Sequence, residues 1–160
     1  MKRYLCSLVL GALSLLASVT GKAMAQPSYS FTTLDVPGSS KASAVALGIN
    51  ASGQIVGSYY DTAYIHHGFL YDQGGYTTLD VPGSNYTHAN GINDSGQIVG
   101  TYYDAAKGIH GFLLDQGNYT TLDVPGSTWT QAHAINDSGQ IVGSYRDGAG
   151  QHGFLATPVP

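Results

Sequence analysis

Glutamate is absent from this chain of 160 residues, cysteine occurs once, and lysine and arginine together number six. A lone cysteine, Cys6, cannot form an intramolecular disulfide, so burial and hydrogen bonding must stabilise the fold. No stretch after residue 26 has the 3.6-residue apolar period of a helix, and no long hydrophobic run follows the first 25 residues. These absences exclude a disulfide-stapled scaffold, a helical bundle and a multispan membrane protein.

The first 25 residues have the pattern of a secretory signal peptide. Lys2 and Arg3 precede the apolar stretch "YLCSLVLGALSLLASVT", and "AMA" follows before Gln26. Small residues at those positions suit a signal peptidase, so cleavage is predicted after Ala25. An uncleaved membrane anchor is the alternative, which the short, Ser- and Gly-interrupted run disfavours. The mature protein, residues 26–160, is therefore expected to be secreted or periplasmic and not inserted in a membrane.

Cleavage would leave a strongly acidic protein. Lys41, Lys107 and Arg146 are the basic residues that remain, and ten aspartates against these three give a net charge of about −7. Nucleic acids and anionic membranes bind through clusters of basic side chains. Neither is predicted to be a partner.

Three copies of one pattern fill the rest of the chain. "SGQIVG" occurs three times at a spacing of 43 residues, "TTLDVPGS" begins at residues 32, 77 and 120, and "HGFL" begins at 67, 110 and 152. A fixed period of this kind indicates a repeat architecture. A single repeat domain is expected, with units at roughly 28–75, 76–118 and 119–160.

Each unit has the composition of four short strands. Residues 119–124, "YTTLDV", alternate between two faces, and Pro125-Gly126 ends the strand. "ANGIN", "QIVGTYY" and "HGFLLD" are the next three, with an Asn-Asp-Ser-Gly turn between the first two. The N-terminal "YSFTTLDV" precedes any hairpin, so it is expected to supply the missing strand of the last unit, within one chain or between two chains.

Four strands in 43 residues is the size of a β-propeller blade. The predicted fold is all-β, with three blade-like repeats. Three blades are too few for an ordinary propeller. Two chains could therefore form a six-bladed ring as a homodimer, or the units could pack as a β-prism or β-trefoil.

The chain resembles the HAF-type bacterial extracellular repeat family. The resemblance rests on "GINDSGQIVG" at 91–100, on the three "HGF" triplets and on "TTLDVPGS", and it covers essentially all of residues 26–160. The name-giving triplet is His-Ala-Phe, whereas glycine stands in the middle here. The resemblance implies propeller-like repeats and export, and it implies no catalytic activity or cofactor.

Three repeated histidines are the candidates for chemistry. His67, His110 and His152 each follow an aspartate by five or six residues. They could converge on a metal ion. The favoured interpretation is that each packs or hydrogen-bonds near the start of its strand, with the aspartate across the hairpin as a candidate partner. The other histidines, His66, His88 and His133, are expected at the surface.

An enzyme is not predicted. A Ser-His-Asp site needs one unique constellation, whereas these residue types recur in every unit. "NDSG" is interpreted as a turn, not as a calcium loop. The aspartates of "LDVPG", at 35, 80 and 123, are expected to bond nearby backbone amides. A hydrolase or metal enzyme remains the least favoured alternative.

Binding is predicted where the copies differ. Tyr86 and Trp129 occupy equivalent positions, and Arg146 replaces Tyr60 and Tyr103. Variable positions on a rigid β scaffold often carry binding, and flat aromatic rings suit stacking on a sugar. These five residues are the candidate site of a binding module for a glycan or another cell-surface component. A purely structural extracellular or adhesion scaffold is the alternative.

Overall fold

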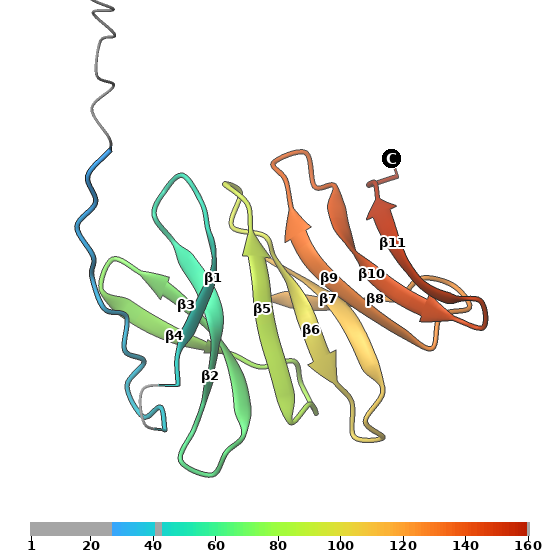
Figure 1. The fold of residues 1–160 in the computed structure, drawn as a ribbon, viewed down its shortest axis with the longest axis horizontal. Helices are drawn as coiled ribbons and strands as arrows, with labels where there is room; N and C mark the ends of the chain where they lie inside the picture. Colours follow the sequence, from blue (N-terminus) through green and yellow to red (C-terminus); the bar gives the residue numbers. More distant parts are fainter. Residues whose placement is uncertain (1–26, 41–42, 160) are drawn as a thin grey trace, which may run out of the picture. The chain divides into compact units, whose positions relative to one another are not determined.

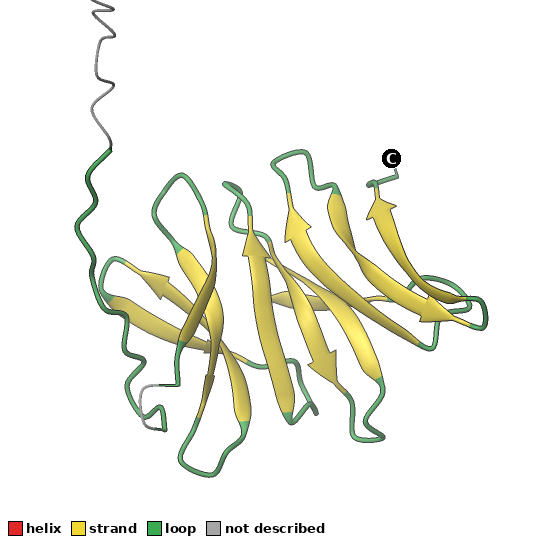
Figure 2. Ribbon diagram, in the orientation of Figure 1, coloured by secondary structure: helices red, strands yellow, loops and turns green. Residues whose placement is uncertain are grey.

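The computed structural model describes residues 27–40 and 43–159, which contain strands and turns but no helix (Figures 1 and 2). The all-β prediction is confirmed. The predicted signal peptide, residues 1–25, lies outside the described residues. Nowhere in the described ranges is there a helix that is long and apolar enough to span a bilayer.

Eleven strands lie within the unit Thr33–Pro160. They are β1 (Val45–Ile49), β2 (Ile55–Tyr60), β3 (His66–Asp72), β4 (Gly75–Leu79), β5 (Tyr86–Ile92), β6 (Ile98–Tyr103), β7 (Ile109–Asp115), β8 (Asn118–Leu122), β9 (Trp129–Ile135), β10 (Ile141–Asp147) and β11 (Gly150–Ala156). In Figure 1, β1 and β11 stand at opposite ends of this unit.

The strands form two sheets of successive antiparallel pairs. Strands β1–β4 pair in chain order, as do β5–β8, and one parallel residue pair between β3 and β5, His66 and Tyr86, joins them into an eight-stranded sheet. Strands β9–β11 form a separate three-stranded sheet. Short turns explain this local pairing, because antiparallel neighbours need only a few residues between them.

The N-terminal segment does not pair with β11 within the single chain. Residues 29–36 form no strand in the single chain, and β11 therefore has no fourth strand beside it among the described residues. Val36 is nevertheless buried, and it packs with Tyr59 and Phe69 of the first four strands. Packing of the "VPGS" turn at this position holds the end of the segment on β2 and β3.

A glycine–phenylalanine contact recurs in the core. Gly100 of β6 lies opposite Phe112 of β7, whose ring has no exposed surface. A Cβ atom on Gly100 would clash with the carbonyl oxygen of His88 and would lie 2.6 Å from a ring carbon of Phe112. The glycine of "QIVG" therefore repeats because the ring occupies the space of a side chain.

The Asn-Asp turns connect successive copies of the repeated nonapeptide. Within one turn, Asn93 Oδ1 accepts the backbone N–H of Gln97, at 2.9 Å. Between turns, Asn50 Nδ2 donates to the carbonyl of Asn93 (3.1 Å), and Asn93 Nδ2 donates to that of Asn136 (3.0 Å). The backbone N–H of Asp94 likewise donates to Asp137 Oδ1, at 2.9 Å. This ladder explains why the same letters recur every 43 residues.

Candidate functional site

A polar groove lies between β5, β6 and β9. It encloses about 230 Å³ and is lined by Tyr86, His88, Asn90, Thr101, Gln131 and His133. Its lining contains an aromatic ring, two amides, a hydroxyl and two imidazoles, and no lysine, arginine or carboxylate. Such a surface offers many neutral hydrogen-bonding groups beside one flat ring.

Strand alternation brings these side chains together. Successive residues of a strand point to opposite faces, so Tyr86, His88 and Asn90 share one face of β5. Thr87 and Ala89 on the other face are fully buried. On the groove face the copies differ: Trp129, Gln131 and His133 of β9 stand where β5 has Tyr86, His88 and Asn90. On the buried face the copies agree: Thr87 and Ala89 of β5 correspond to Thr130 and Ala132 of β9.

An aromatic stack borders the groove. The rings of His66 and Tyr86 lie 4.3 Å apart at 11°, and those of Tyr86 and Tyr103 lie 4.1 Å apart at 14°. Tyr60 meets His66 edge-on at 4.4 Å. Burial raises the pKa of Tyr86, and its neighbours Tyr103 and Tyr60 raise it further. Three of the five predicted site residues, Tyr60, Tyr86 and Tyr103, thus meet in one stack.

The other two predicted residues form a pair of their own. Trp129 and Arg146 lie opposite each other in the register of β9 and β10. Trp129 is half-buried and Arg146 is exposed. Neither lines the groove, although Trp129 begins the strand that carries Gln131 and His133. A flat ring and a cation therefore stand side by side at the start of β9.

Hydrogen bonds hold the groove side chains in place. His88 Nδ1 lies 2.7 Å from Asn90 Oδ1, and Asn90 Nδ2 donates to the carbonyl oxygen of Ala132, also at 2.7 Å. His133 Nε2 lies 2.9 Å from Ser144 Oγ. Burial lowers the pKa of His88, partly offset by the bond to Asn90. At neutral pH the His88 imidazole is therefore uncharged and can donate or accept a hydrogen bond.

The prediction that His66 lies at the surface was wrong. Its ring is buried between Tyr60 and Tyr86, and Nδ1 lies 3.2 Å from the carbonyl oxygen of Thr87. Burial is the main cause that lowers the pKa of His66. His88 is half-buried, whereas His133 is exposed as expected. Repetition separates His67 from His66 in the sequence, but it did not reveal the burial of His66, because Tyr86 and Thr87 come from the next hairpin.

The repeated histidines bond aspartates. His67 Nε2 lies 3.5 Å from Asp61 Oδ2, and its Nδ1 lies 2.9 Å from Asp80 Oδ1. His110 lies between Asp104 and Asp123 in the same way, at 3.4 and 2.8 Å. His152 contacts Asp147 at 3.3 Å. The interpretation that each histidine bonds the aspartate across its hairpin is confirmed.

The repeated histidines do not come together. The described residues contain no group of three or more His, Cys, Asp or Glu side chains able to hold a metal ion. The expected role of the "LDVPG" aspartates needs correction for two of them, since the carboxylates of Asp80 and Asp123 bond His67 and His110. Each of these two histidines connects a loop aspartate to the end of the neighbouring strand.

Protonation of His110 is expected to stabilise the fold. Burial lowers its pKa, but the bonds and charges of Asp123 and Asp104 more than offset this, so its pKa is raised. A raised folded-state pKa gives stability that is present below the unfolded value of about 6.5 and is lost as the pH rises through the folded value. The melting-temperature gap between wild type and His110→Gln should therefore be wider at about pH 6 than at about pH 8.5.

His88 provides the control with the opposite sign. Its lowered pKa means that folding loses stability as the pH falls below the unfolded value. The gap between wild type and His88→Gln should therefore shrink on going to lower pH. Melting curves at the two pH values test both variants, and a His110→Gln gap that does not change with pH would contradict the prediction.

The groove itself was only partly predicted. Sequence comparison of the copies identified Tyr86 but not His88, Asn90, Thr101 or Gln131. The signal that could have found them is the alternation of variable and repeated residues along 86–91 and 129–134. Comparisons with known proteins add no assignment: no protein-family model matches the chain, and no curated protein matches it.

Proposed function

We propose that this protein is an exported repeat protein that binds a neutral carbohydrate in the groove between β5 and β9. The observation that carries the proposal is the gathering of the variable positions on one groove face, beside the ring stack of His66, Tyr86 and Tyr103. Residues that serve the fold are repeated, so unrepeated polar residues in one hollow favour binding.

The chemistry of the lining supports a sugar ligand. A pyranose presents hydroxyl groups at its rim and C–H bonds on its faces. The amides of Asn90 and Gln131 and the imidazoles of His88 and His133 offer both donors and acceptors. Tyr86, whose two faces stack on His66 and Tyr103, offers its ring edge and hydroxyl. No cation lines the groove, so a neutral sugar fits it better than a sulfated or uronic-acid polymer.

The proposal includes the architecture. The 43-residue units are propeller-blade-like, in keeping with the resemblance to HAF-type repeats, and residues 1–25 direct export. Antiparallel groups β1–β4 and β5–β8 in chain order support this assignment. A binding protein outside the cell also fits the recurrence of Ser, His and Asp in every unit, because a catalytic site needs one unique constellation.

A glycan-array screen of the exported protein tests the function. Binding is expected to neutral oligosaccharides and to be insensitive to salt, because no charged side chain of the described groove takes part. An array without any bound glycan, or one with only sulfated glycans bound, would contradict the proposal. In the first case a structural scaffold is the function that remains.

Two groove variants should weaken binding. Tyr86→Ala removes the ring, and Gln131→Ala removes an amide that makes no hydrogen bond among the described residues. We expect each to raise Kd at least about tenfold, equivalent to about 1.4 kcal/mol. Tyr64→Ala is the matched control, since Tyr64 is an exposed loop tyrosine outside the stack. Calorimetric titration with the best array ligand measures all three.

Because Tyr86 also packs on His66, its loss can lower stability. Gln131→Ala separates the two effects, as it leaves the stack intact. Melting temperatures should fall for Tyr86→Ala and stay near wild type for Gln131→Ala. Unchanged affinity in a folded Gln131→Ala variant would argue against this groove as the site.

A further inference from the structure

The last sheet is unfinished at β11. Strand β3 pairs with β4 on its outer side, and β7 pairs with β8, whereas no described strand pairs with the outer edge of β11. In the first two cases Gly68 and Gly111 lie against the carbonyls of Leu79 and Leu122. A Cβ atom added to Gly153 at the same position would have just the carbonyl oxygen of Gly143 within 4 Å, at 3.8 Å. An unpaired edge presents backbone donors and acceptors to another strand.

Apolar residues that are buried inside the chain are exposed at its two ends. Val56 and Val99 are 0 % exposed, but the equivalent Val142 is 46 % exposed. At the other end, Ile49 is 67 % exposed, while its equivalent Ile92 is 7 % exposed. Within the chain, Val56 packs in one cluster with Ile92 of the next group of strands. Val142 therefore lacks the packing partner that Val56 has in Ile92, and the exposed Ile49 is the residue equivalent to that partner.

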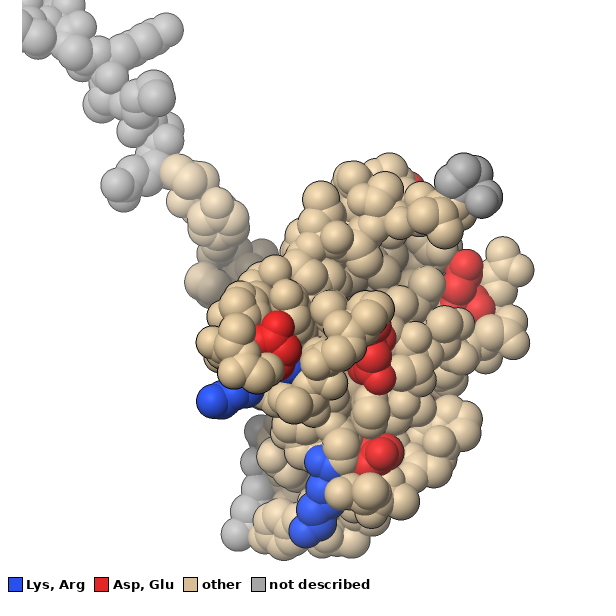
Figure 3. Space-filling view, turned by 90° about the vertical axis from the view of Figure 1, so that its right-hand side faces the viewer, with Lys and Arg blue, Asp and Glu red and all other residues tan. Residues whose placement is uncertain are grey.

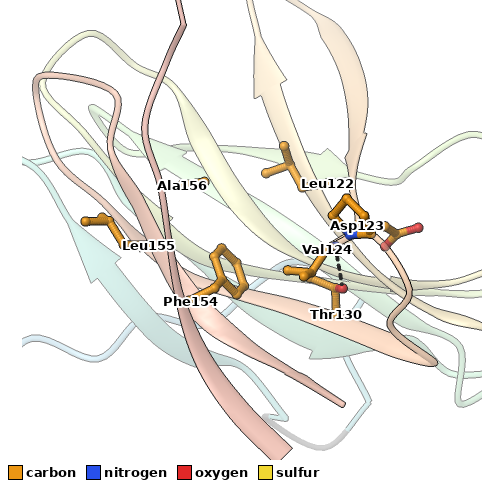
Figure 4. A pocket seen from close by; sticks show the side chains of 8 residues that line it. Leu122, Asp123, Val124, Thr130, Phe154, Leu155 and Ala156 are labelled. Carbon is orange, nitrogen blue, oxygen red and sulfur yellow. Dashed lines mark hydrogen bonds between the residues drawn. The ribbon is translucent and has the colours of Figure 1, made fainter. Parts of the chain in front are cut away.

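An apolar cavity lies beside the unpaired edge. It encloses about 300 Å³ and is lined by Leu122, Asp123, Val124, Pro125, Thr130, Phe154, Leu155 and Ala156 (Figure 4). At the equivalent places inside the chain a tyrosine packs on the phenylalanine. Tyr76 meets Phe69 at 5.8 Å, and Tyr119 meets Phe112 at 5.6 Å, both edge-on. Phe154 has no such ring against it among the described aromatic pairs.

The repeated histidine at this end has lost one of its two aspartates. His67 and His110 each contact a loop aspartate through Nε2 and the aspartate of "LDVPG" through Nδ1. His152 contacts Asp147 through Nε2, and no aspartate of the described chain faces its Nδ1. The missing strand, ring and carboxylate all belong to one "(Y/F)TTLDV" segment.

The chain contains a copy of that segment outside the sheets. Residues 31–36, "FTTLDV", align Phe31 with Tyr76 and Tyr119, and Asp35 with Asp80 and Asp123. Phe31 is 95 % exposed. Val36 at the end of the segment is held on Tyr59 and Phe69 of β2 and β3, at the end of the unit opposite to β11 (Figure 1). Val36 therefore anchors the segment away from the β11 edge of its own chain, which leaves that edge to a neighbouring molecule.

We propose that the β11 edge binds residues 31–36 of a second copy of this protein, and that two copies close head to tail into one ring. The register follows from β3–β4 and β7–β8. Leu34 of the second copy lies opposite Gly153, its Phe31 lies opposite Ala156 and fills the cavity on Phe154, and its Asp35 bonds His152 Nδ1. Each histidine then has two aspartates.

The faces of the two copies complement each other beyond this strand. Val142 enters a hollow of about 250 Å³ on the second copy, lined by Ala46, Leu47, Gly48, Ile49 and Ile55. In Figure 3, which faces the β11 end, the acidic and basic patches are separated from one another by uncharged surface. Asn136 Nδ2 is placed to donate to the carbonyl of Asn50 of the second copy, which continues the asparagine ladder.

Single-cysteine variants test the contact. Asp35→Cys and His152→Cys are made separately, each with Cys6→Ser, given tags of different mass, mixed and oxidised. A disulfide between the two different chains is expected in most of the protein. Asp35→Cys mixed with His110→Cys is the matched control and should give none, because β8 already occupies the edge of β7.

Other outcomes would overturn the proposal. An internal disulfide in the Asp35→Cys/His152→Cys double variant, with none between mixed chains, would show that the segment closes on its own chain. Absence of both disulfides in variants that keep their melting temperature would show that the edge does not take the segment. Light scattering of the unmodified protein should give two copies. A single copy at every concentration would overturn the contact, and an open series of sizes would overturn the closed pair.

Ala51 allows a test by gain of affinity. Within the chain, the N–H of Ala51 donates to Asp94 and that of Asp94 donates to Asp137. Between copies, the N–H of Asp137 would face Ala51, which has no carboxylate. Ala51→Asp should therefore lower the dissociation constant of the pair several-fold. Ala149→Asp, in an exposed turn, is the charge control and should leave it unchanged. A weakened pair in Ala51→Asp alone would overturn the proposed register.

Discussion

Replacing Phe112 with alanine is expected to lower the free energy of unfolding by about 3–5 kcal/mol. The ring has no exposed surface and lies in the cluster that contains Val56, Leu79 and Ala89, so it connects the first group of strands to the second. Tyr119 also packs edge-on against it. Alanine would leave a cavity that flanking strands cannot fill without breaking their hydrogen bonds.

A loss of that size is a large part of the stability of a small domain, which is about 5–15 kcal/mol in total. Urea unfolding followed by tyrosine and tryptophan fluorescence measures it. Ile65→Ala is the control, because Ile65 is an exposed apolar residue in the loop between β2 and β3. It should change the unfolding free energy by less than about 0.5 kcal/mol. Equal effects of the two substitutions would show that the cluster is not the core of the fold.

Gly100→Ala should be nearly as damaging, although it adds a single methyl group. The new Cβ would clash with the His88 carbonyl oxygen on one side and the Phe112 ring on the other. Relief requires β5 to move away from β6 or the ring to leave its place, and both break the core. We expect the free energy of unfolding to fall by about 3 kcal/mol or more, at the upper end of the effects of overpacking a core.

Gly148→Ala serves as the matched control for this effect. A Cβ atom there meets no atom within 4 Å, and the residue lies in the exposed turn between β10 and β11. Its melting temperature should match that of wild type. If Gly100→Ala has the same melting temperature as wild type, the Phe112 ring does not lie against Gly100.

Local features of this fold could be predicted because they depend on nearby residues. Alternation in "YTTLDV" and the Pro-Gly and Asn-Asp-Ser-Gly turns predicted strands that the structure confirms at β4 and β8. The bonds of His67 and His110 to Asp61 and Asp104 also span just six residues. Residues 29–36 form no strand in the single chain for a physical reason: a strand needs an edge to pair with, and Val36 anchors this segment on β2 and β3, away from the unpaired edge of β11.

Long-range contacts decided the candidate site. His66 and His67 are neighbours in the sequence, yet one is buried in a ring stack with Tyr86 and the other bonds two aspartates. The groove depends on β5 and β9, whose side chains are 43 residues apart. The burial of His66 and the lining of the groove cannot be derived from spacing in the sequence, because both depend on a strand of another repeat.

The sequence by itself determined an all-β chain with three copies of one unit, since hydrophobic alternation and turn residues act over a few positions. It also determined which positions serve the fold, because these are the ones that repeat. Tertiary structure alone decided which face of β5 is open, which histidine is buried, and which edge is unpaired. The physical reason is that burial and strand pairing depend on the neighbouring unit, so identical letters have different environments in the middle of the chain and at its ends.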